Sequence, residues 1–257
     1  MELALRDKTI VILGSVQATL QNAVVNFLQQ GADVAIIDSG ADKLQKFCQN
    51  LNDQKEMNEK FGRATAIPVK WEDAASIKDA IGKAAQTFGS IDIMIDALCS
   101  TKPTPLQIGA GSVEPTQFDE IIQTNSVASL HATQFIGQFL KSRKRGRMIY
   151  LIQDPILRAQ SADAVAAAAR SGMIAFAKTL ARELQDQHVS VNCVSLGLTE
   201  EYLLGHFPDC ANGKEALEKM KAIEPSAKMS DPEKISHALI FLCGSSGAAI
   251  TGQHLVV

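Results

Sequence analysis

Two residues near the start of the chain have the types and the spacing of a dinucleotide-binding site. Gly14 ends a short apolar run, Thr9–Leu13, and Asp38 directly follows a second apolar run, Val34–Ile37. A glycine after the first strand permits a tight turn beside a pyrophosphate, and an acid about 20 residues later can bind the adenosine ribose. Such an acid favours NAD over NADP, although Asp38 could equally cap the turn before the next helix.

The elements that must position these two residues follow from the apolar periodicity. Between the two runs, apolar residues recur at helical spacing, and Gly31 ends the helix that they predict; they are Ala23, Val24, Phe27 and Leu28. Residues 8–38 are therefore predicted to form a strand, a glycine turn, a helix and a second strand.

The same alternation of strands and helices continues along the chain. Short apolar runs predict strands at 64–69, 91–95, 147–152, 189–194 and 253–257, and helical patterns predict helices at 74–88, 116–140, 160–184 and 232–243. This order predicts an α/β fold with a doubly wound, Rossmann-like, mostly parallel sheet covered by helices on both faces. We expect a single domain over residues 1–257, in which about 198–230 form a substrate-loop region.

The composition excludes several classes of partner and site. The net charge of −3 at pH 7 argues against nucleic acid, and no apolar run is long enough to cross a membrane. The five cysteines include no Cys-x-x-Cys pair and the five histidines have no metal-ligand spacing, so we expect no metal site. Scattered thiols and a charged start unlike a signal segment predict a cytoplasmic protein.

Three segments resemble the short-chain dehydrogenase/reductase family. FGSIDIMIDA, at 88–97, is similar to the segment that ends in Asn-Asn-Ala in that family, and VNCVSLG, at 191–197, is similar to its Val-Asn-x-Val-x-Pro-Gly. The closing DPEKISHALIFLCGSSGAAITGQHLVV, at 231–257, resembles its final helix and Ile-Thr-Gly-Gln strand. The resemblance covers nearly the whole chain and implies the Rossmann-like fold of the family.

The family's glycine pattern, Thr-Gly-x-x-x-Gly-x-Gly, is mostly lost. Gly14 keeps the first glycine, whereas Ala18 and Leu20 occupy the other two glycine positions. A side chain at either position hinders the approach of the backbone to a pyrophosphate. The resemblance thus leaves Gly14 and Asp38 as the residual cofactor-binding residues. We expect no bound cofactor, and NAD(H) rather than NADP(H) if one binds.

The resemblance also implies where the catalytic Ser, Tyr and Lys of the family would lie. Gln153 falls at the Ser, Ala166 at the Tyr and Arg170 at the Lys, while Asn125 matches the family's Asn. The methyl group of Ala166 cannot transfer a proton, a step that contributes roughly 10²–10⁴-fold in rate. Arg170 keeps a positive charge, and Gln153 could still donate a hydrogen bond to a carbonyl. Asn125 could equally be a buried amide that pairs with its own helix.

No alternative Tyr restores the pattern. The enoyl-reductase branch of the family has a longer spacing from Tyr to Lys, which would place its Tyr at Asp163. The two tyrosines of the chain are Tyr150, in a predicted strand, and Tyr202, in the predicted loop region. Neither is followed by Lys at the family's spacing.

Three functions remain open from the sequence. The leading hypothesis is a pseudoenzyme that acts as a binding, scaffold or regulatory protein for an unknown protein or small molecule. The second is a divergent NAD(H)-dependent oxidoreductase acting on a carbonyl, alcohol or enoyl substrate through other residues. The third is a hydrolytic or lyase activity in the same pocket. The resemblance also implies a homodimer or homotetramer that pairs the helices at 116–140 and 160–184.

Overall fold

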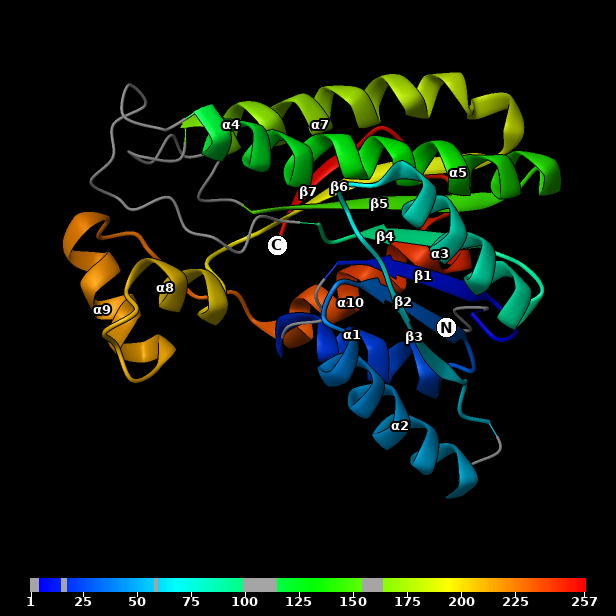
Figure 1. Ribbon diagram of the computed structural model, residues 1–257, viewed down its shortest axis with the longest axis horizontal. Helices are drawn as coiled ribbons and strands as arrows, with labels where there is room; N and C mark the ends of the chain where they lie inside the picture. The colour runs from blue at the N-terminus through cyan, green and yellow to red at the C-terminus, as the bar shows by residue number, and fades with distance from the viewer. Residues whose placement is uncertain (1–4, 15–17, 58–59, 99–114, 154–163) are drawn as a thin grey trace.

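The computed structural model describes residues 5–14, 18–57, 60–98, 115–153 and 164–257 (Figure 1). Within these ranges a seven-stranded sheet runs in the order β3-β2-β1-β4-β5-β6-β7, with every neighbouring pair parallel. The strands are β1 Thr9–Leu13, β2 Asp33–Asp38, β3 Ala64–Pro68, β4 Ile93–Asp96, β5 Gly146–Gln153, β6 Val189–Leu196 and β7 His254–Val256. The predicted α/β fold with a doubly wound parallel sheet in one domain is confirmed.

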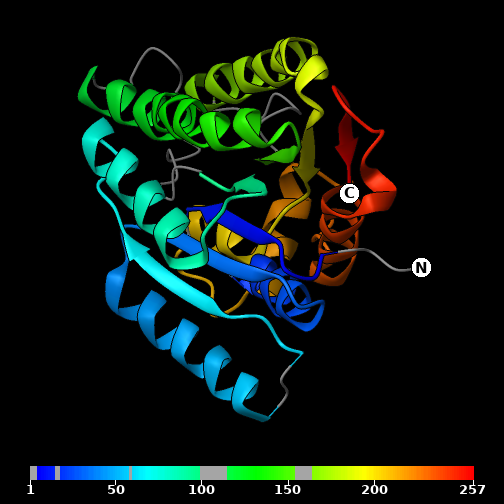
Figure 2. The same cartoon turned by 90° about the vertical axis from the view of Figure 1, so that its right-hand side faces the viewer.

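Helices cover both faces of the sheet, which is why the central strands are continuous apolar runs rather than alternating ones. One face packs against α1 Ala18–Gln29, α2 Ala41–Met57 and α10 Pro232–Cys243. The other face packs against α3 Ala74–Phe88, α5 Ala128–Arg143 and α7 Ala164–Glu183. Figure 2 shows the resulting layers, with α5 and α7 on one side of the sheet and α2 on the other.

The long helix predicted at 116–140 is interrupted. The structure has α4 Pro115–Ile122, then a π-helical turn, Gln123–Val127, and then α5. A π turn inserts an extra residue into an α-helix and is frequent at functional sites. It places Asn125 in the wide turn, where the side chain donates to the Ile121 carbonyl oxygen at 2.9 Å.

The region 198–230 contains two helices rather than a simple loop. They are α8 Glu200–His206 and α9 Gly213–Ile223, and both begin at a side-chain cap. Thr199 accepts a hydrogen bond from the Tyr202 amide, and Asn212 accepts from the amides of Lys214 and Glu215. The two helices share a small apolar cluster that includes Leu203 and Met220. They follow β6 and lie past the carboxyl edge of the sheet, on the left in Figure 1.

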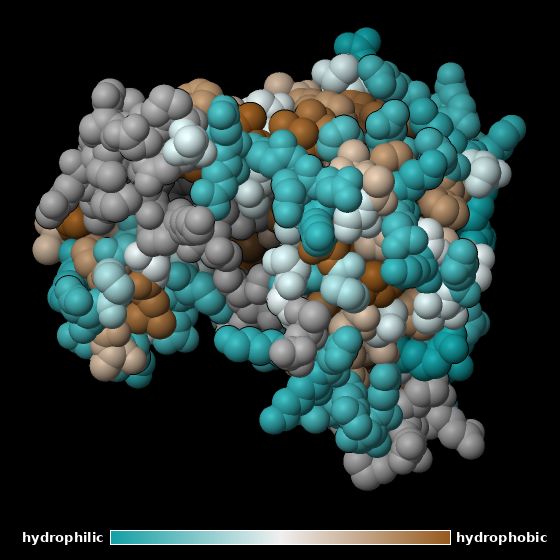
Figure 3. Space-filling view, viewed as in Figure 1, coloured by the Kyte–Doolittle hydropathy of each residue, from teal (hydrophilic) through white to brown (hydrophobic). Residues whose placement is uncertain are grey.

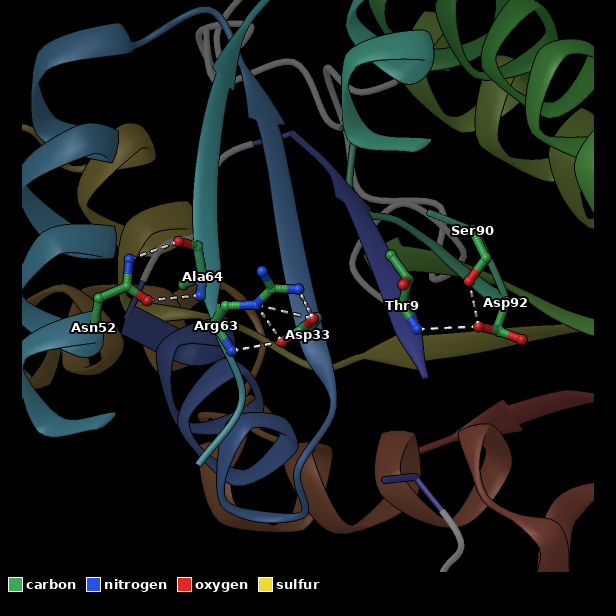
Figure 4. A network of polar contacts seen from close by, with 7 residues as sticks. All are labelled: Thr9, Asp33, Asn52, Arg63, Ala64, Ser90 and Asp92. Atoms are coloured by element: carbon green, nitrogen blue, oxygen red, sulfur yellow. Dashed lines mark hydrogen bonds and ion pairs between the residues drawn. The ribbon is translucent and has the colours of Figure 1, made fainter. Parts of the chain in front are cut away.

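Polar contacts connect the strands at their amino-terminal ends, the end of the sheet opposite to α8 and α9 (Figure 4). Asp33 at the start of β2 pairs with Arg63 at 2.7 Å, directly before β3. Asp92, directly before β4, accepts from the Thr9 amide of β1 at 3.1 Å. Three cations surround the same Asp92 carboxylate at 3.7–3.8 Å: Lys8, Arg143 and Arg145. These contacts fix the strand register at the amino-terminal ends of the strands, opposite to Gly14 and Asp38.

Candidate functional site

The carboxyl ends of β1 and β4 mark the point where the sheet changes direction. The chain proceeds from β1 to β2 on one side, and returns to β4 on the other side of β1. Ligands of doubly wound sheets bind in the crevice at this switch point. The residues that end β1, β2 and β4 therefore form the candidate site.

Gly14 makes the turn at the end of β1. Its φ is +98°, a value that disfavours a side chain, and its amide donates to the Ile37 carbonyl oxygen at 2.9 Å. A Cβ at this position would lie 2.9 Å from the Ala97 carbonyl oxygen, so the loops after β1 and β4 approach each other closely. The predicted role of Gly14 in the turn therefore has a clear structural basis.

The remaining glycine-pattern positions lie in α1. Leu20 is 5% exposed and packs in the apolar core between α1 and the sheet. Ala18 is the first residue of α1, and its side chain lies outside the described part of the structure, as do residues 15–17. The first turn of α1 carries no acidic residue. A helix N-terminus of this kind attracts anions through its free amides.

Asp38 ends β2 and is half-buried beside this turn. Its carbonyl oxygen accepts from the Val69 amide at 3.2 Å, which ties the end of β2 to the segment after β3. Gly14, the start of α1 and Asp38 together fit the adenosine half of NAD: a side-chain-free turn, anion-attracting amides and a carboxylate for the ribose.

Asn125 and Arg170 form a hydrogen bond near Asp96, the last residue of β4. Arg170 projects from α7, is 2% exposed, and donates from Nε to Asn125 Oδ1 at 3.0 Å. Asn125 in turn donates to the Ile121 carbonyl oxygen. The structure thus brings together two of the four predicted site residues, and the Asn125 amide also pairs with its own helix.

The other two predicted site residues contribute less to the described geometry. Ala166 lies on α7, one turn before Arg170, and is partly exposed. Gln153 is the last residue of β5, but its side chain lies outside the described part of the chain, as does Asp163. Within the described residues, no proton donor stands at the position that resembles the family's Tyr.

A buried acid to which the sequence analysis gave no functional role lies near Arg170. Asp96 ends β4 with no exposed surface, and Oδ1 accepts from the Leu98 amide at 2.9 Å. Burial raises the pKa of Asp96, while the charge of Arg170 and the hydroxyl of Ser129 act in the opposite direction. A signal was present in the sequence, because Asp96 directly follows the apolar run Ile93–Ile95 of a central strand.

Tyr150 is buried next to this acid. Its hydroxyl lies 2.7 Å from Thr133 Oγ1, and burial strongly raises its pKa. Tyr202, on α8, stacks on His206 with ring centroids 4.1 Å apart. A further pair, Ser195 and His254, shares a hydrogen bond of 2.5 Å between β6 and β7.

The described residues contain no group of three or more His, Cys, Asp or Glu side chains placed to hold a metal ion. None of the described helices is long and apolar enough to cross a membrane.

The comparisons with known proteins agree on one family. Residues 21–257 match the family model described as enoyl-(acyl carrier protein) reductase. The 2,3-dihydro-2,3-dihydroxybenzoate dehydrogenase of Bacillus subtilis is 24% identical and covers 98% of this chain and 95% of its own length. The 3-oxoacyl-(acyl-carrier-protein) reductase of Thermotoga maritima is 22% identical and covers 97% of this chain and 95% of its own length.

Solved structures share the fold. A 3-ketoacyl-(acyl-carrier-protein) reductase from Brucella melitensis, complexed with NADH, superimposes with a TM-score of 0.82 at 22% identity, over 99% of this chain and 98% of that one. An NAD⁺-bound xylitol dehydrogenase also gives a TM-score of 0.82, at 15% identity and with the same two coverages.

These findings bear on two expectations from the sequence. The pseudoenzyme hypothesis, with its expectation that the chain is not an enzyme, is contradicted, because the relatives are named as dehydrogenases and reductases. The expectation of no cofactor is weakened, because two neighbours of the same fold hold NADH and NAD⁺. The first expectation compared Gln153, Ala166 and Arg170 with the family one by one and the second compared Ala18 and Leu20, whereas hydride transfer needs a dinucleotide and a proton source rather than one particular side chain.

The fold and the family model support the same assignment. The family model matches residues 21–257, from α1 to β7. The two relatives match this chain over nearly their whole lengths. The chain belongs to the short-chain dehydrogenase/reductase family.

Proposed function

We propose that this protein is an NAD(H)-dependent oxidoreductase acting on a carbonyl, alcohol or enoyl substrate. The observation that carries the proposal is the pairing of the Gly14 turn with Asp38 at the switch point of the sheet. The names of the relatives support the reaction class, because they are dehydrogenases and reductases of hydroxyl and oxo compounds.

One set of residues would bind the adenosine and pyrophosphate part of the dinucleotide, and a second set would bind its nicotinamide end. Gly14 and the amides of the first turn of α1 suit the pyrophosphate, and the Asp38 carboxylate suits the adenosine ribose hydroxyls. Arg170 and Asn125, behind the end of β4, suit the nicotinamide end, where a fixed positive charge orients polar groups. When bound, NAD(H) supplies or accepts the hydride.

We further propose that the family's Ser, Tyr and Lys are replaced here by Gln153, Ala166 and Arg170. The collinear motifs around these positions support this alignment. An arginine guanidinium donates hydrogen bonds but does not give up a proton in proteins, so Arg170 can orient a proton donor but cannot serve as one. The proton for the substrate oxygen must therefore come from another group.

Residues 198–230 are proposed to shape the substrate end of the site. They follow β6, lie past the carboxyl edge, and hold together through their own apolar cluster. The parallel bridge between Leu198 and Met229 closes the base of this region.

The decisive test of the proposed function is a calorimetric titration with NADH and NADPH. We expect the wild type to bind NADH more tightly, and Asp38→Asn to weaken NADH binding by about 10- to 100-fold, because a charged hydrogen-bond acceptor is lost. The titration is followed by a screen of ketones, aldehydes and enoyl thioesters for NADH oxidation.

Asp33→Asn is the matched control for Asp38→Asn. Asp33 lies at the other end of the same strand, β2, where it pairs with Arg63. Its substitution should lower stability slightly and leave NADH affinity unchanged. A wild-type protein that binds neither dinucleotide, or that oxidises NADH with no member of the panel, would contradict the proposed function.

We also propose a homo-oligomer, dimer or tetramer. Phe118 on α4 and Leu130 on α5 are 47% and 39% exposed, and Figure 3 shows apolar residues gathered over α5 and α7 along the upper edge. Light scattering should give a mass above the 27.6 kDa of one chain. Leu130→Asp should shift it toward the monomer, and Ile223→Asp, exposed on α9, should not. A wild type that is monomeric at micromolar concentration would refute this.

The proposed setting is the cytoplasm, with a small molecule rather than nucleic acid as the ligand. The described cysteines are free and buried thiols: Cys48, Cys193, Cys210 and Cys243. Unpaired thiols are typical of a reducing compartment.

A further inference from the structure

We propose that Gln123 is a positioning residue of the dinucleotide site. Its side chain connects residues 69–73, the segment after β3, to the π turn at Gln123–Val127, and the same turn is bonded to Arg170 on α7. The contact thereby sets the spacing between the adenosine end and the nicotinamide end of the site. The inference rests on the proposed oxidoreductase function and adds a residue to it.

Side chains of the π turn bond to two separate parts of the fold. On one side, Gln123 Nε2 donates to the Trp71 carbonyl oxygen in the segment after β3, at 3.3 Å. On the other side, Asn125 Oδ1 accepts from Arg170 Nε at 3.0 Å. One turn of five residues therefore joins the segment after β3 to α7.

A second bond strengthens the junction between the π turn and α7. Ser126 Oγ donates to the Ala169 carbonyl oxygen at 3.3 Å, and Ala169 directly precedes Arg170. Two neighbouring residues of the turn thus hold two neighbouring residues of α7. A shift of the turn must therefore move this part of α7 as well.

The segment after β3 lies beside the proposed adenosine end of the site. The Val69 amide donates to the Asp38 carbonyl oxygen at 3.2 Å, and the Lys70 amide donates to Ser76 Oγ at 3.0 Å. These bonds fix the local shape of the segment without Gln123. What Gln123 adds is the connection to the π turn.

Arg170 stands at the proposed nicotinamide end of the same connection. It is 2% exposed, and its Nη2 has no hydrogen-bond partner within the described residues, so the bond from Nε to Asn125 fixes the direction of its guanidinium. A ligand that binds at both ends is sensitive to their spacing, because a misplacement of about 1 Å can cost roughly 10²-fold in rate.

The first test compares NADH with ADP, which carries the adenosine and the pyrophosphate but no nicotinamide end. Gln123→Met keeps the approximate length of the side chain and removes its donor. We expect calorimetry to show NADH binding weakened by about 5- to 10-fold, the value of one hydrogen bond, and ADP binding unchanged, since only NADH spans both ends. Equal losses for the two ligands, or wild-type affinity for NADH, would overturn the inference.

Asn52→Leu is the matched control. Asn52 also holds the backbone of β3 through a side-chain amide: Nδ2 donates to the Ala64 carbonyl oxygen and Oδ1 accepts from the Ala64 amide, both at 2.8 Å. This contact lies at the amino-terminal end of β3 (Figure 4). The variant should be less stable than the wild type, and, while folded, should bind NADH and ADP with wild-type affinity.

The second test needs no ligand, because Trp71 is the only tryptophan of the chain and its fluorescence reports on the segment after β3. Arg170→Lys keeps the positive charge and removes the Nε donor. We expect acrylamide to quench Trp71 with a higher rate constant in Gln123→Met and in Arg170→Lys, and with the wild-type constant in Asn52→Leu. A wild-type constant in Arg170→Lys would show that the π turn does not connect α7 to this segment.

The two kinds of failure are distinct. A wild type that binds NADH, together with a Gln123→Met protein that binds it equally well, would overturn the role of Gln123 and leave the proposed function standing. A wild type that binds neither NADH nor ADP would overturn the proposed function and the positioning role with it.

Discussion

Gly62→Ala is expected to lower the free energy of unfolding by several kcal/mol and to leave little folded protein. A Cβ on Gly62 would overlap the Ala32 carbonyl oxygen and lie 2.6 Å from the carbonyl carbon. Both atoms belong to the backbone, so neither can move aside as the tip of a side chain can. Because domains are stable by only about 5–15 kcal/mol, a backbone shift here endangers the whole fold.

The position of Gly62 explains the size of this effect. Its amide donates to the Leu28 carbonyl oxygen at 2.8 Å, which holds the chain directly before β3 against the end of α1. Two residues later Ala64 pairs with Val34, the second residue of β2. A displacement at Gly62 therefore breaks the register of β3 on β2, the strand that carries Asp38.

Gly82→Ala is the matched control. Gly82 lies in α3, and no described atom lies within 4 Å of the Cβ that the substitution adds. Alanine is the better helix former, so this variant should gain about 0.5–1 kcal/mol. Urea denaturation followed by circular dichroism compares the two. A Gly62→Ala protein with the wild-type midpoint would show that β2 and β3 tolerate the added methyl group.

The sheet could be predicted from sequence because each strand is a short apolar run between clear breakers. Thr9–Leu13 is buried throughout, as a strand covered on both faces must be. The π turn around Asn125 could not be predicted in the same way. Its apolar neighbours keep a helical spacing, and the extra residue is revealed only by the backbone, where the Ala128 amide donates to the carbonyl oxygen of Gln123, five residues earlier.

The helices at 200–206 and 213–223 could have been predicted. Thr199 precedes two acidic residues, and Asn212 precedes a glycine and a charged run, which are ordinary signals for helix starts. The resemblance to the family implied a substrate loop in this place instead. The caps seen at Thr199 and Asn212 are the physical reason for the two helices.

Only part of the candidate site could be predicted from the sequence. Gly14 and Asp38 stand out because turn geometry and strand ends are local properties. The contact between Arg170 and Asn125 is not local, since it joins α7 to the π turn at Gln123–Val127. A comparison of positions registers a lost Tyr or Lys, but it does not register a contact that forms only when the chain folds. The pseudoenzyme hypothesis is contradicted by the relatives, which are named as dehydrogenases and reductases.

Gly14→Ala is expected to weaken NADH binding by at least 100-fold and to lower stability as well. The added Cβ would lie 2.9 Å from the Ala97 oxygen, 3.0 Å from the Ala97 carbon and 3.1 Å from the Leu98 nitrogen. All three are backbone atoms of the loop after β4, so the two loops that face the ligand must separate. A displacement of about 1 Å between reacting or binding groups costs roughly 10²-fold.

Gly89→Ala separates this clash from the general strain of a positive φ. Gly89 follows α3 with φ +77°, and no described atom lies within 4 Å of its added Cβ. In both variants the side chain at a positive φ should lower the free energy of unfolding by about 1–2 kcal/mol. Only Gly14→Ala should also displace the loops at the site. Calorimetric titration with NADH, at a temperature where urea curves show both variants folded, should give wild-type affinity for Gly89→Ala alone. If folded Gly14→Ala binds NADH as the wild type does, the dinucleotide does not lie on this turn.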